Sequence, residues 1–251
     1  METITSRQNP LIRHVRRLAA SRAYRAECGE YLCDGVKLLD EALRWNAPVR
    51  TVIFTEKAAV PVLPAGVRAV CVDAELMRYA SPMETPQGAL FTLALPHPAL
   101  PDRLDGRHYL VLDGVQDPGN VGTIVRTADA FCCDGIFLVN ACADPYGPKA
   151  ARATMGAIFR REVISCEAES LVGLLRSEGI PLYGAALRDD TEDIRSVNFA
   201  RAAVAVGSEG KGLSDQVLSL CDRTVRIPMS ERCESLNAAV AASVALWEMF
   251  R

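Results

Sequence analysis

The sequence lacks the long apolar run that a membrane-spanning helix requires. Although 49% of its 251 residues are hydrophobic, no stretch approaches the roughly 18 consecutive apolar residues of a membrane span. The N-terminus, METITSRQNP, has no basic region followed by an apolar stretch, so no secretory signal is expected. The composition predicts a soluble, cytoplasmic protein of one or two globular domains with no membrane partner.

Paired cysteines are also missing. The nine cysteines are an odd number, and no two of them form a CxxC pair, which disfavours both a disulfide framework and a zinc site. We therefore expect reduced thiols and no bound metal. The cysteines are Cys28, Cys33, Cys71, Cys132, Cys133, Cys142, Cys166, Cys221 and Cys233.

Positive charge is not in excess over the whole chain. The formal net charge of −3 argues against a polyelectrolyte that binds nucleic acid with its entire surface. Basic residues are nevertheless concentrated in residues 1–26, where Glu2 is the one acid, and in residues 145–161, which contain no acid. Either segment can follow a phosphate backbone, although runs of charge more often only solvate a helix face. The candidate RNA contacts are Arg7, Arg13, Arg16, Arg17, Lys149 and Arg152.

Three prolines and a glycine separate two regions of regular pattern. PHPALPDRLDGRH, residues 96–108, is typical of a domain linker. Before it, the apolar runs EYLCD, VRTVIF, VRAVCV and ALFTLAL around the helical stretch VKLLDEALRW predict a small α/β domain. Leu11, Val15 and Leu18 have the spacing of a helix face. We predict an N-terminal domain of residues 1–98, a linker of residues 99–108 and a C-terminal domain of residues 109–251.

The C-terminal domain alternates apolar runs with helical patterns. The runs YLVL, GIFLV, PLYGAA, AAVAV and TVRI, with helices between them, predict a parallel sheet covered on both faces. Ligands of such sheets bind at the carboxyl ends of the strands. We call the segment that follows a strand its exit. Three exits are rich in glycine, proline or small polar residues, which let a backbone approach a ligand closely: DGVQDPGN, GSEGKGLS and PMSERCESLN.

The first exit leads into an amphipathic helix. Apolar residues at i, i+3 and i+4 spacing predict its buried face. They are Val121, Ile124, Val125, Ala128 and Phe131. Gly122, Arg126 and Asp129 then share the opposite face. Asn120 is either the N-cap of this helix or part of a site, and Arg126 is either a site residue or a surface arginine paired with Asp129.

The second and third exits carry Glu209, Ser235 and Asn237. GSEGKGLS is not a phosphate loop, because GxxxxGK followed by Ser or Thr is absent, and the first strand of this domain lacks the GxGxxG of a dinucleotide site. The glycines fit a turn before a helix, but an acid among them favours a ligand contact. Ser235 has the position of an N-cap, whereas Asn237 lies one turn inside the last helix and is a poor helix former, which favours binding.

The last helix has an apolar stripe. Such a stripe is expected in the intramolecular core, with a dimer seam as the alternative. It consists of Leu236, Val240, Val244, Trp247 and Phe250.

Together, the three exits resemble the SpoU (TrmH-like) branch of the SPOUT RNA methyltransferases. DPGNVGTIVRTADAF, VAVGSEGKGLS and IPMSERCESLNAAVAASVALWE are similar to three ordered motifs of that family. DPYGPKAARATMGAIFR is similar to a stretch between the first two, with Thr154 where relatives more often have serine. Residues 1 to about 95 resemble the RNA-binding domain often fused in front. The resemblance implies an α/β fold with a deep trefoil knot, preceded by a smaller α/β RNA-binding domain.

The resemblance also implies a chemistry. It implies S-adenosyl-L-methionine as cofactor, methylation of a ribose 2′-hydroxyl of RNA, and a homodimer with composite sites. The implied cofactor contacts, mainly through backbone groups, are Leu187, Gly207, Glu209, Ile227, Met229, Leu236 and Ala239. The implied catalytic residues are Asn120, Arg126, Glu209, Ser235 and Asn237.

Arg126 is the residue that the family assigns to activation of the hydroxyl. A guanidinium is essentially never deprotonated in a protein. We therefore expect Arg126 to bind the adjacent phosphate and to stabilise oxyanion character. The extra N-terminal domain favours structured ribosomal RNA over transfer RNA. A catalytically silent RNA-binding protein of the same fold is the rival from another class, and a nicotinamide oxidoreductase is disfavoured by the missing GxGxxG.

Overall fold

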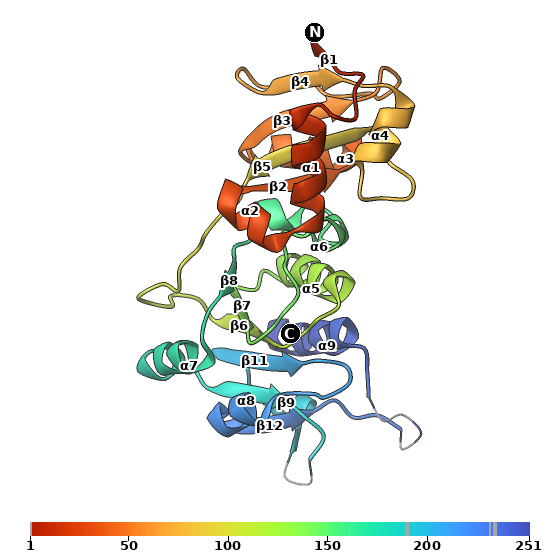
Figure 1. The fold of residues 1–251 in the computed structure, drawn as a ribbon. Coiled ribbons are helices and arrows are strands. Elements are labelled where there is room, and N and C mark those ends of the chain that lie inside the picture. The colour runs from red at the N-terminus through yellow and green to blue at the C-terminus, as the bar shows by residue number, and fades with distance from the viewer. Residues whose placement is uncertain (1, 189–190, 231, 233–234) are drawn as a thin grey trace. The chain divides into compact units, whose positions relative to one another are not determined.

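The computed structural model describes residues 2–188, 191–230, 232 and 235–251, and the chain divides into two compact units (Figure 1). The first contains the chain up to Pro96 together with Tyr146–Arg160. The second contains His97–Pro145 and Arg161–Arg251. The segment Tyr146–Arg160 therefore packs with the N-terminal residues, although the sequence pattern placed it in the C-terminal domain.

The first unit contains a mixed sheet with the strand order β1-β4-β3-β5-β2. β1 (Glu2–Thr3), β4 (Arg68–Cys71) and β3 (Val49–Phe54) are parallel, whereas β5 (Ala89–Ala94) runs antiparallel to β3 and to β2 (Glu30–Asp34). The four predicted strands of this region are confirmed. β1 was not predicted, because two residues are too few to show a period.

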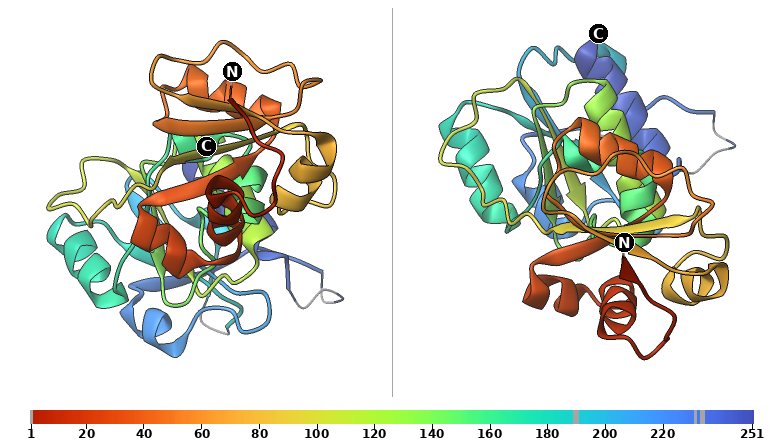
Figure 2. Two further views of the ribbon diagram at one scale, coloured as in Figure 1. Left: turned by 45° about the horizontal axis from the view of Figure 1, so that its top comes forward. Right: turned by 90° about the horizontal axis from the view of Figure 1, so that it is seen from above.

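Helices cover both faces of this sheet (Figure 2). α1 (Pro10–Ala20) and α4 (Ala74–Ala80) share a core with Leu32 and Leu90, and α2 (Arg22–Cys28) follows α1. α1 begins where the Asn9 side chain accepts the N–H of Leu11, and its predicted face is buried. α3 (Val36–Arg44) contacts β2 and β5 from the other side.

The segment Tyr146–Arg160 joins this unit through aromatic contacts. It forms α6 (Pro148–Ala153) and a 3-10 turn (Ala157–Phe159). The Tyr146 ring lies 5.2 Å from that of Tyr31 on β2, and the Phe159 ring lies 6.4 Å from that of Phe91 on β5. Side chains alternate along a strand, so Tyr31 and Phe91 point away from Leu32 and Leu90. The segment therefore packs on the sheet face opposite α1.

The second unit contains a parallel sheet with the order β10-β12-β9-β11-β6-β7-β8. The five predicted strands of this domain and their parallel arrangement are confirmed. β8 and β10 are too short to show a pattern in the sequence. The strands are β6 (His108–Asp113), β7 (Gly135–Val139), β8 (Val163–Ser165), β9 (Leu182–Ala185), β10 (Glu192–Asp193), β11 (Ala202–Gly207) and β12 (Arg223–Arg226).

Two pairs of helices cover the two faces of this parallel sheet. α7 (Ala168–Ser177) and α8 (Asp215–Leu220) share one core with β6, β7, β9 and β11. α5 (Pro118–Ala130) and α9 (Ala238–Phe250) lie side by side on the opposite face (Figure 2). β6 and β11 are neighbours, yet the helices that follow them, α5 and α8, cover opposite faces. The loops after these two strands therefore diverge at the carboxyl edge, where open parallel sheets bind ligands.

Within the described residues, no helix combines the length and apolar character needed to cross a membrane. The eight described cysteines are free thiols, and Cys233 lies outside the described residues. Burial raises the pKa of the Cys133 thiol to about 12, so this thiol is protonated at neutral pH. No cluster of potential metal ligands is present among the described residues.

Candidate active site

A cavity of about 430 Å³ lies at the carboxyl edge of the parallel sheet. Its walls come from the segments after β9, β11 and β12 and from the first turns of α9. The strand register brings these exits together, since Ala185 at the end of β9 pairs with Val225 on β12. A volume of this size lies within the range of about 300–1,000 Å³ that holds small-molecule ligands.

Most of the predicted cofactor contacts line this cavity. They are Leu187, Gly207, Glu209, Ile227, Met229 and Leu236. Ala239 is buried and lines a neighbouring groove instead, whereas Ala238 and Ala241 face the cavity from α9. Helix geometry explains the difference, because positions three apart share a face and adjacent positions are turned by about 100°.

The loop after β11 folds back tightly over Gly207. Ser208 and Gly212 exchange two backbone hydrogen bonds, of 3.0 and 2.9 Å. A Cβ at Gly207 would clash with the backbone of Gly212 and with the amide nitrogen of Leu213, so only glycine fits there. The loop thereby presents Ser208, Glu209 and Gly210 to the cavity. Sequence reasoning singled out Gly207 and Glu209 and missed Ser208 and Gly210, which are their direct neighbours.

The helix caps next to the cavity differ from the prediction. Asp117, not Asn120, caps α5, because its side chain accepts the N–H of Asn120 at 2.9 Å. Asn237, not Ser235, caps α9, where its Oδ1 accepts the N–H of Ala239 at 2.9 Å and that of Val240 at 3.3 Å. The expectation that Asn237 lies inside the helix is therefore wrong. Ser235 instead lines the cavity.

These caps fix the direction of a chain of amide hydrogen bonds. Since the Oδ1 of Asn237 is used by the helix end, its Nδ2 is left to donate, and it donates to the Oδ1 of Asn120 at 3.1 Å. The Nδ2 of Asn120 in turn donates to Oε1 of Glu209. Residues from all three predicted motifs thus meet through hydrogen bonds at the edge of the cavity. In each asparagine the oxygen accepts and the NH₂ group donates the next hydrogen bond, so the Glu209 carboxyl accepts the last hydrogen bond of the chain.

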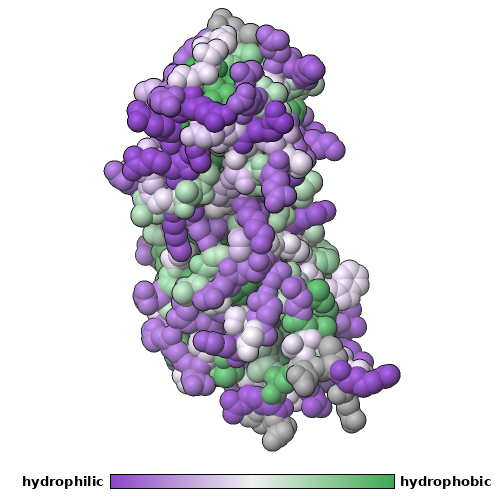
Figure 3. Space-filling model, turned by 45° about the vertical axis from the view of Figure 1, so that its right-hand side comes forward, coloured by the Kyte–Doolittle hydropathy of each residue, from purple (hydrophilic) through white to green (hydrophobic). Residues whose placement is uncertain are grey.

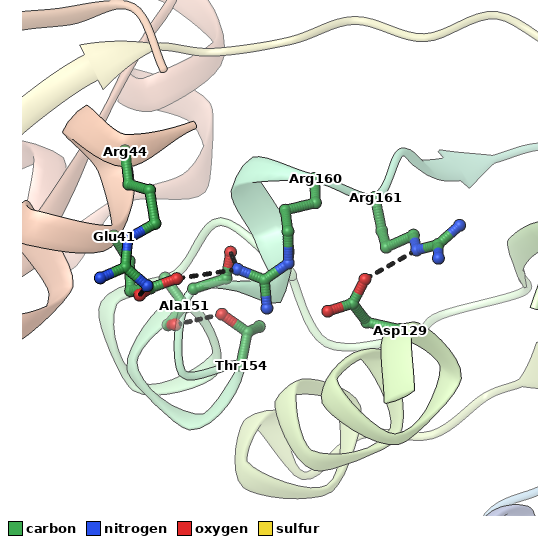
Figure 4. Close-up of polar contacts among 8 residues, drawn as sticks. Glu41, Arg44, Asp129, Ala151, Thr154, Arg160 and Arg161 are labelled. Atoms are coloured by element: carbon green, nitrogen blue, oxygen red, sulfur yellow. Dashed lines mark hydrogen bonds and ion pairs between the residues drawn. The ribbon is translucent and has the colours of Figure 1, made fainter. Parts of the chain in front are cut away.

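Arg126 is not part of this hydrogen-bonded group. It is exposed on α5 and is not among the residues that line the cavity. The expected alternative, an ion pair with Asp129, is wrong: Oδ1 of Asp129 accepts from Nε of Arg161 at 2.8 Å (Figure 4). Within the described residues, the Arg126 guanidinium makes no hydrogen bond or ion pair. Gly122, expected on the same open face, is buried.

The apolar stripe of α9 does not belong to the intramolecular core. The side chains that α9 buries are mainly its alanines, together with Leu246 and Met249. Val240, Trp247 and Phe250 are each about half exposed, at 48%, 55% and 54%. Phe131, expected on the buried face of α5, is half-buried, and its ring lies 5.8 Å from those of Trp247 and Phe250. A groove beside the Asn120–Asn237 pair is lined by Phe131, Val240, Val244 and Trp247.

The candidate RNA-binding arginines of the first unit lie on α1 and just before it. Arg7, Arg13, Arg16 and Arg17 are exposed. The guanidinium groups of Arg7 and Arg16 lie 4.8 and 4.1 Å from the centre of the Tyr79 ring, and that of Arg17 lies 3.8 Å from the centre of the Tyr24 ring. Hydrophilic residues cover much of the face shown in Figure 3.

The second basic segment is less open. Lys149 is exposed, whereas Arg152 is half-buried and its charge lies near Asp34. Burial raises the pKa of the Asp34 carboxyl, and the charge of Arg152 opposes that rise. Arg160 donates to Glu41 at 3.0 Å, and the Thr154 hydroxyl donates to the carbonyl of Ala151 at 2.7 Å (Figure 4). The polar groups of Arg160 and Thr154 thus make their contacts within the first unit.

Two family models match this chain. The SpoU rRNA Methylase family matches residues 107–247, which include every residue of the cavity, and the MRM3-like substrate binding domain matches residues 9–90. The chain belongs to the SpoU rRNA methylase family. Its C-terminal unit is accordingly a SPOUT methyltransferase fold, as the resemblance of the three motifs implied.

Individual relatives of this family extend over the whole chain. The 23S rRNA (guanosine(2553)-2′-O)-methyltransferase RlmP of Bacillus subtilis is 29% identical over 99% of both chains. The 23S rRNA (uridine(2479)-2′-O)-methyltransferase of Streptomyces viridochromogenes is 32% identical over 99% of this chain and 91% of its own. The AdoMet-bound rRNA methyltransferase of Sinorhizobium meliloti is similar in structure, with a TM-score of 0.87, 27% identity, and coverage of 99% of this chain and 97% of its own.

The cavity fits the cofactor of SpoU methylases, S-adenosylmethionine. Leu187, Ile227 and Met229 offer apolar walls for a flat ring system. The closely folded glycine loop brings backbone groups to the surface of the cavity with no side chain in the way at Gly210 and Gly212. Glu209 places an acceptor carboxyl at the wall of the cavity.

Proposed function

We propose that this protein transfers a methyl group from S-adenosylmethionine to a ribose 2′-hydroxyl of ribosomal RNA. The observation that carries the proposal is the hydrogen-bonded meeting of Asn237, Asn120 and Glu209, one from each motif, at the rim of the cavity. The names of the relatives RlmP and the uridine(2479) enzyme, both 23S rRNA 2′-O-methyltransferases, support ribosomal RNA over transfer RNA. Such a substrate would place the protein in the cytoplasm.

In this proposal, different residues of the chain bind the cofactor and orient the 2′-hydroxyl. S-adenosylmethionine supplies an electrophilic methyl group when it is bound. Leu187, Gly207 and Ile227 hold the cofactor side of the cavity, and Met229, Leu236 and the loop around Glu209 close it. Ser235 and the amides of Asn120 and Asn237 lie where the 2′-hydroxyl can be oriented, and a fixed orientation of the reacting groups supplies a large part of the acceleration.

Arg126 binds the phosphate next to the target ribose and stabilises negative charge on the 2′-oxygen. Its exposure and the absence of an internal partner in the described residues support this role, because the guanidinium is left available for an anion. Its planar fork matches a phosphate in a bidentate manner, which an ammonium does not. The proton of the hydroxyl passes to phosphate or solvent, since the guanidinium cannot accept it.

A homodimer completes the proposal. The half-exposed Val240, Trp247 and Phe250 on α9, together with the groove beside them, form an apolar surface of the kind that protein partners cover. This surface adjoins Asn120 and Asn237, so a second copy seated there can bring its own Arg126 to the cavity. That arrangement accounts for an arginine that lies outside the cavity of its own chain.

RNA binding is divided between the two domains. We propose that residues 1–98 form the substrate-binding domain, residues 99–108 the linker and residues 109–251 the methyltransferase domain. The exposed arginines of α1 support phosphate contacts by the first domain. Lys149 and Arg152 add phosphate contacts from Tyr146–Arg160, which packs on the face of the first unit's sheet opposite α1, with the smaller contribution from Arg152 because it is half-buried.

The test is methylation of total RNA with labelled S-adenosylmethionine, followed by mapping of the modified ribose. We expect label in the large ribosomal RNA at one 2′-oxygen. Label found in transfer RNA alone would mean that the substrate is transfer RNA and that the reaction is the one proposed. Calorimetry with S-adenosylmethionine separates the rival function, because a silent RNA-binding protein of this fold would bind RNA and show no heat with the cofactor.

A further inference from the structure

Asp113 is a buried carboxylate at the end of strand β6, which lies between β11 and β7, and it is outside the residues with a predicted role. Its exposed fraction is 2%. It pairs in register with Gly207 on β11, where the glycine loop begins, and with Val139 on β7. A buried carboxylate is costly unless hydrogen bonds replace the water it has lost. The partners of Asp113 therefore show what its charge is used for.

Each carboxylate oxygen accepts a hydrogen bond from a different loop. Oδ2 accepts the backbone N–H of Ser214 at 2.6 Å, and Oδ1 accepts from Nδ2 of Asn140 at 2.6 Å. Ser214 ends the glycine loop and caps α8 through its hydroxyl. Asn140 follows β7 directly with a φ of 56°, a conformation that asparagine adopts more readily than most residues. Asp113 thus joins the ends of β6, β7 and the loop after β11.

The glycine loop depends on its two ends for its position. Residues 209–212 are exposed, whereas Gly207 and Leu213 are buried. At its start the loop is fixed by the β11 ladder and by the close contact of Gly207 with Gly212. At its exit the Ser214 N–H is held by Asp113, seven residues before Asn120. The placement of Glu209 at the cavity and against Asn120 follows from both anchors.

We infer that Asp113 is a positioning residue that presets the glycine loop for the cofactor, an inference that rests on the proposed function. Asp113 offers one acceptor oxygen to each of two N–H donors. An alanine would remove both acceptors, whereas an asparagine keeps one for the Ser214 N–H and can donate its NH₂ group to the Asn140 amide, which can turn to present Oδ1. Without an acceptor at position 113 the loop loses its anchor at the exit, while Leu213 keeps its apolar packing.

The test compares Asp113→Ala with Asp113→Asn. The alanine variant should weaken binding of S-adenosylmethionine, measured by calorimetry, by about 10- to 100-fold, the range for a lost hydrogen bond to a charged group. In the ligand-free protein, hydrogen exchange at the Ser214 amide should accelerate. The asparagine variant keeps an acceptor for that amide, so we expect it to retain most of the affinity and the slower exchange.

Unchanged cofactor affinity in a folded Asp113→Ala protein would overturn the inference, and so would an Asp113→Asn protein that binds as weakly as Asp113→Ala. If Asp113→Ala does not fold, Asn140→Gly removes one donor at a position whose positive φ suits glycine, and should weaken binding about 3- to 10-fold. Failure of the wild-type protein to bind S-adenosylmethionine would instead refute the proposed function. The exchange rate of the Ser214 amide in the ligand-free protein tests the anchor in either case.

Discussion

The two units hold their functional side chains by opposite means. At the cavity, Asn237, Asn120 and Glu209 are fixed by directional hydrogen bonds that start from a helix cap. On α1, Arg16 and Arg17 are held against the flat faces of Tyr79 and Tyr24. A chain of hydrogen bonds is broken when one donor is replaced by an acceptor. An arginine stacked on an aromatic ring keeps its charge when the ring is removed. Substitutions should therefore have large effects in the second unit and graded effects in the first.

The largest effect is expected at Arg126. Arg126→Ala should lower kcat for RNA methylation about 10²- to 10³-fold, the cost of removing one donor to a developing oxyanion. Cofactor binding should be unchanged, because the proposed contact of Arg126 is with the RNA phosphate and not with the cofactor. Single-turnover kinetics with saturating RNA measures the change. Full activity of Arg126→Lys would refute the phosphate clamp, since a lysine cannot reproduce a bidentate contact.

The apolar surface of α9 should give the next effect. Trp247→Ala should weaken the dimer about 30-fold, as expected when an aromatic residue at the centre of an interface is truncated. Analytical ultracentrifugation over a range of protein concentrations measures the dissociation constant. Trp45→Ala is a matched control, because Trp45 has a similar exposure of 51% but lies in the first unit. A fully active wild-type monomer would remove both the dimer and the composite site.

A third prediction separates the two roles of Asn237. Asn237→Asp keeps an oxygen for the amides of Ala239 and Val240 but cannot donate to Asn120. We expect near-normal stability and a loss of about 10-fold in kcat/KM. Asn237→Ala loses the cap as well, and its free energy of unfolding should fall by about 1 kcal/mol. Equal activity of Asn237→Asp and wild type would show that the amide chain has no role in catalysis.

The smallest effects should come from the stacked arginines. Arg16→Ala removes a phosphate contact and should reduce the slope of log K against log salt by about 0.9. Tyr79→Leu keeps the charge and removes only its support, so it should lower RNA affinity about 2- to 5-fold with the slope unchanged. Fluorescence titrations at several salt concentrations measure both. A reduced slope for Tyr79→Leu would mean that the ring itself takes part in the charged contact.

The sequence predicted the longer strands of both sheets because their apolar runs are long enough to show a period. It also predicted most of the cavity wall, since glycine-rich strand exits in a parallel sheet converge at one edge. The cap alternatives for Asn120 and Ser235 were wrong because residues of equal capping ability, Asp117 and Asn237, lie within three positions of them. Only the three-dimensional path decides between such neighbours.

Other features could not be read from local pattern at all. The stripe of α9 looks like core in the sequence, yet the alanines between its large residues form the buried side, because they allow close packing. The return of Tyr146–Arg160 to the first unit is a long-range contact with no local signal. Asp113 was visible as an acid at the end of YLVLD, but its donors are 27 and 101 residues away in the sequence.

The two tryptophans of the chain give each unit its own optical signal. Trp45 lies in the first unit with the Arg160 guanidinium 5.2 Å from its ring centre, and Trp247 lies in the second beside Phe131. Both are about half exposed. Replacing either by phenylalanine leaves a protein with one fluorophore. Arg160 belongs to the segment Tyr146–Arg160. In the Trp247→Phe variant, the fluorescence of Trp45 should therefore change during refolding when this segment packs against α3.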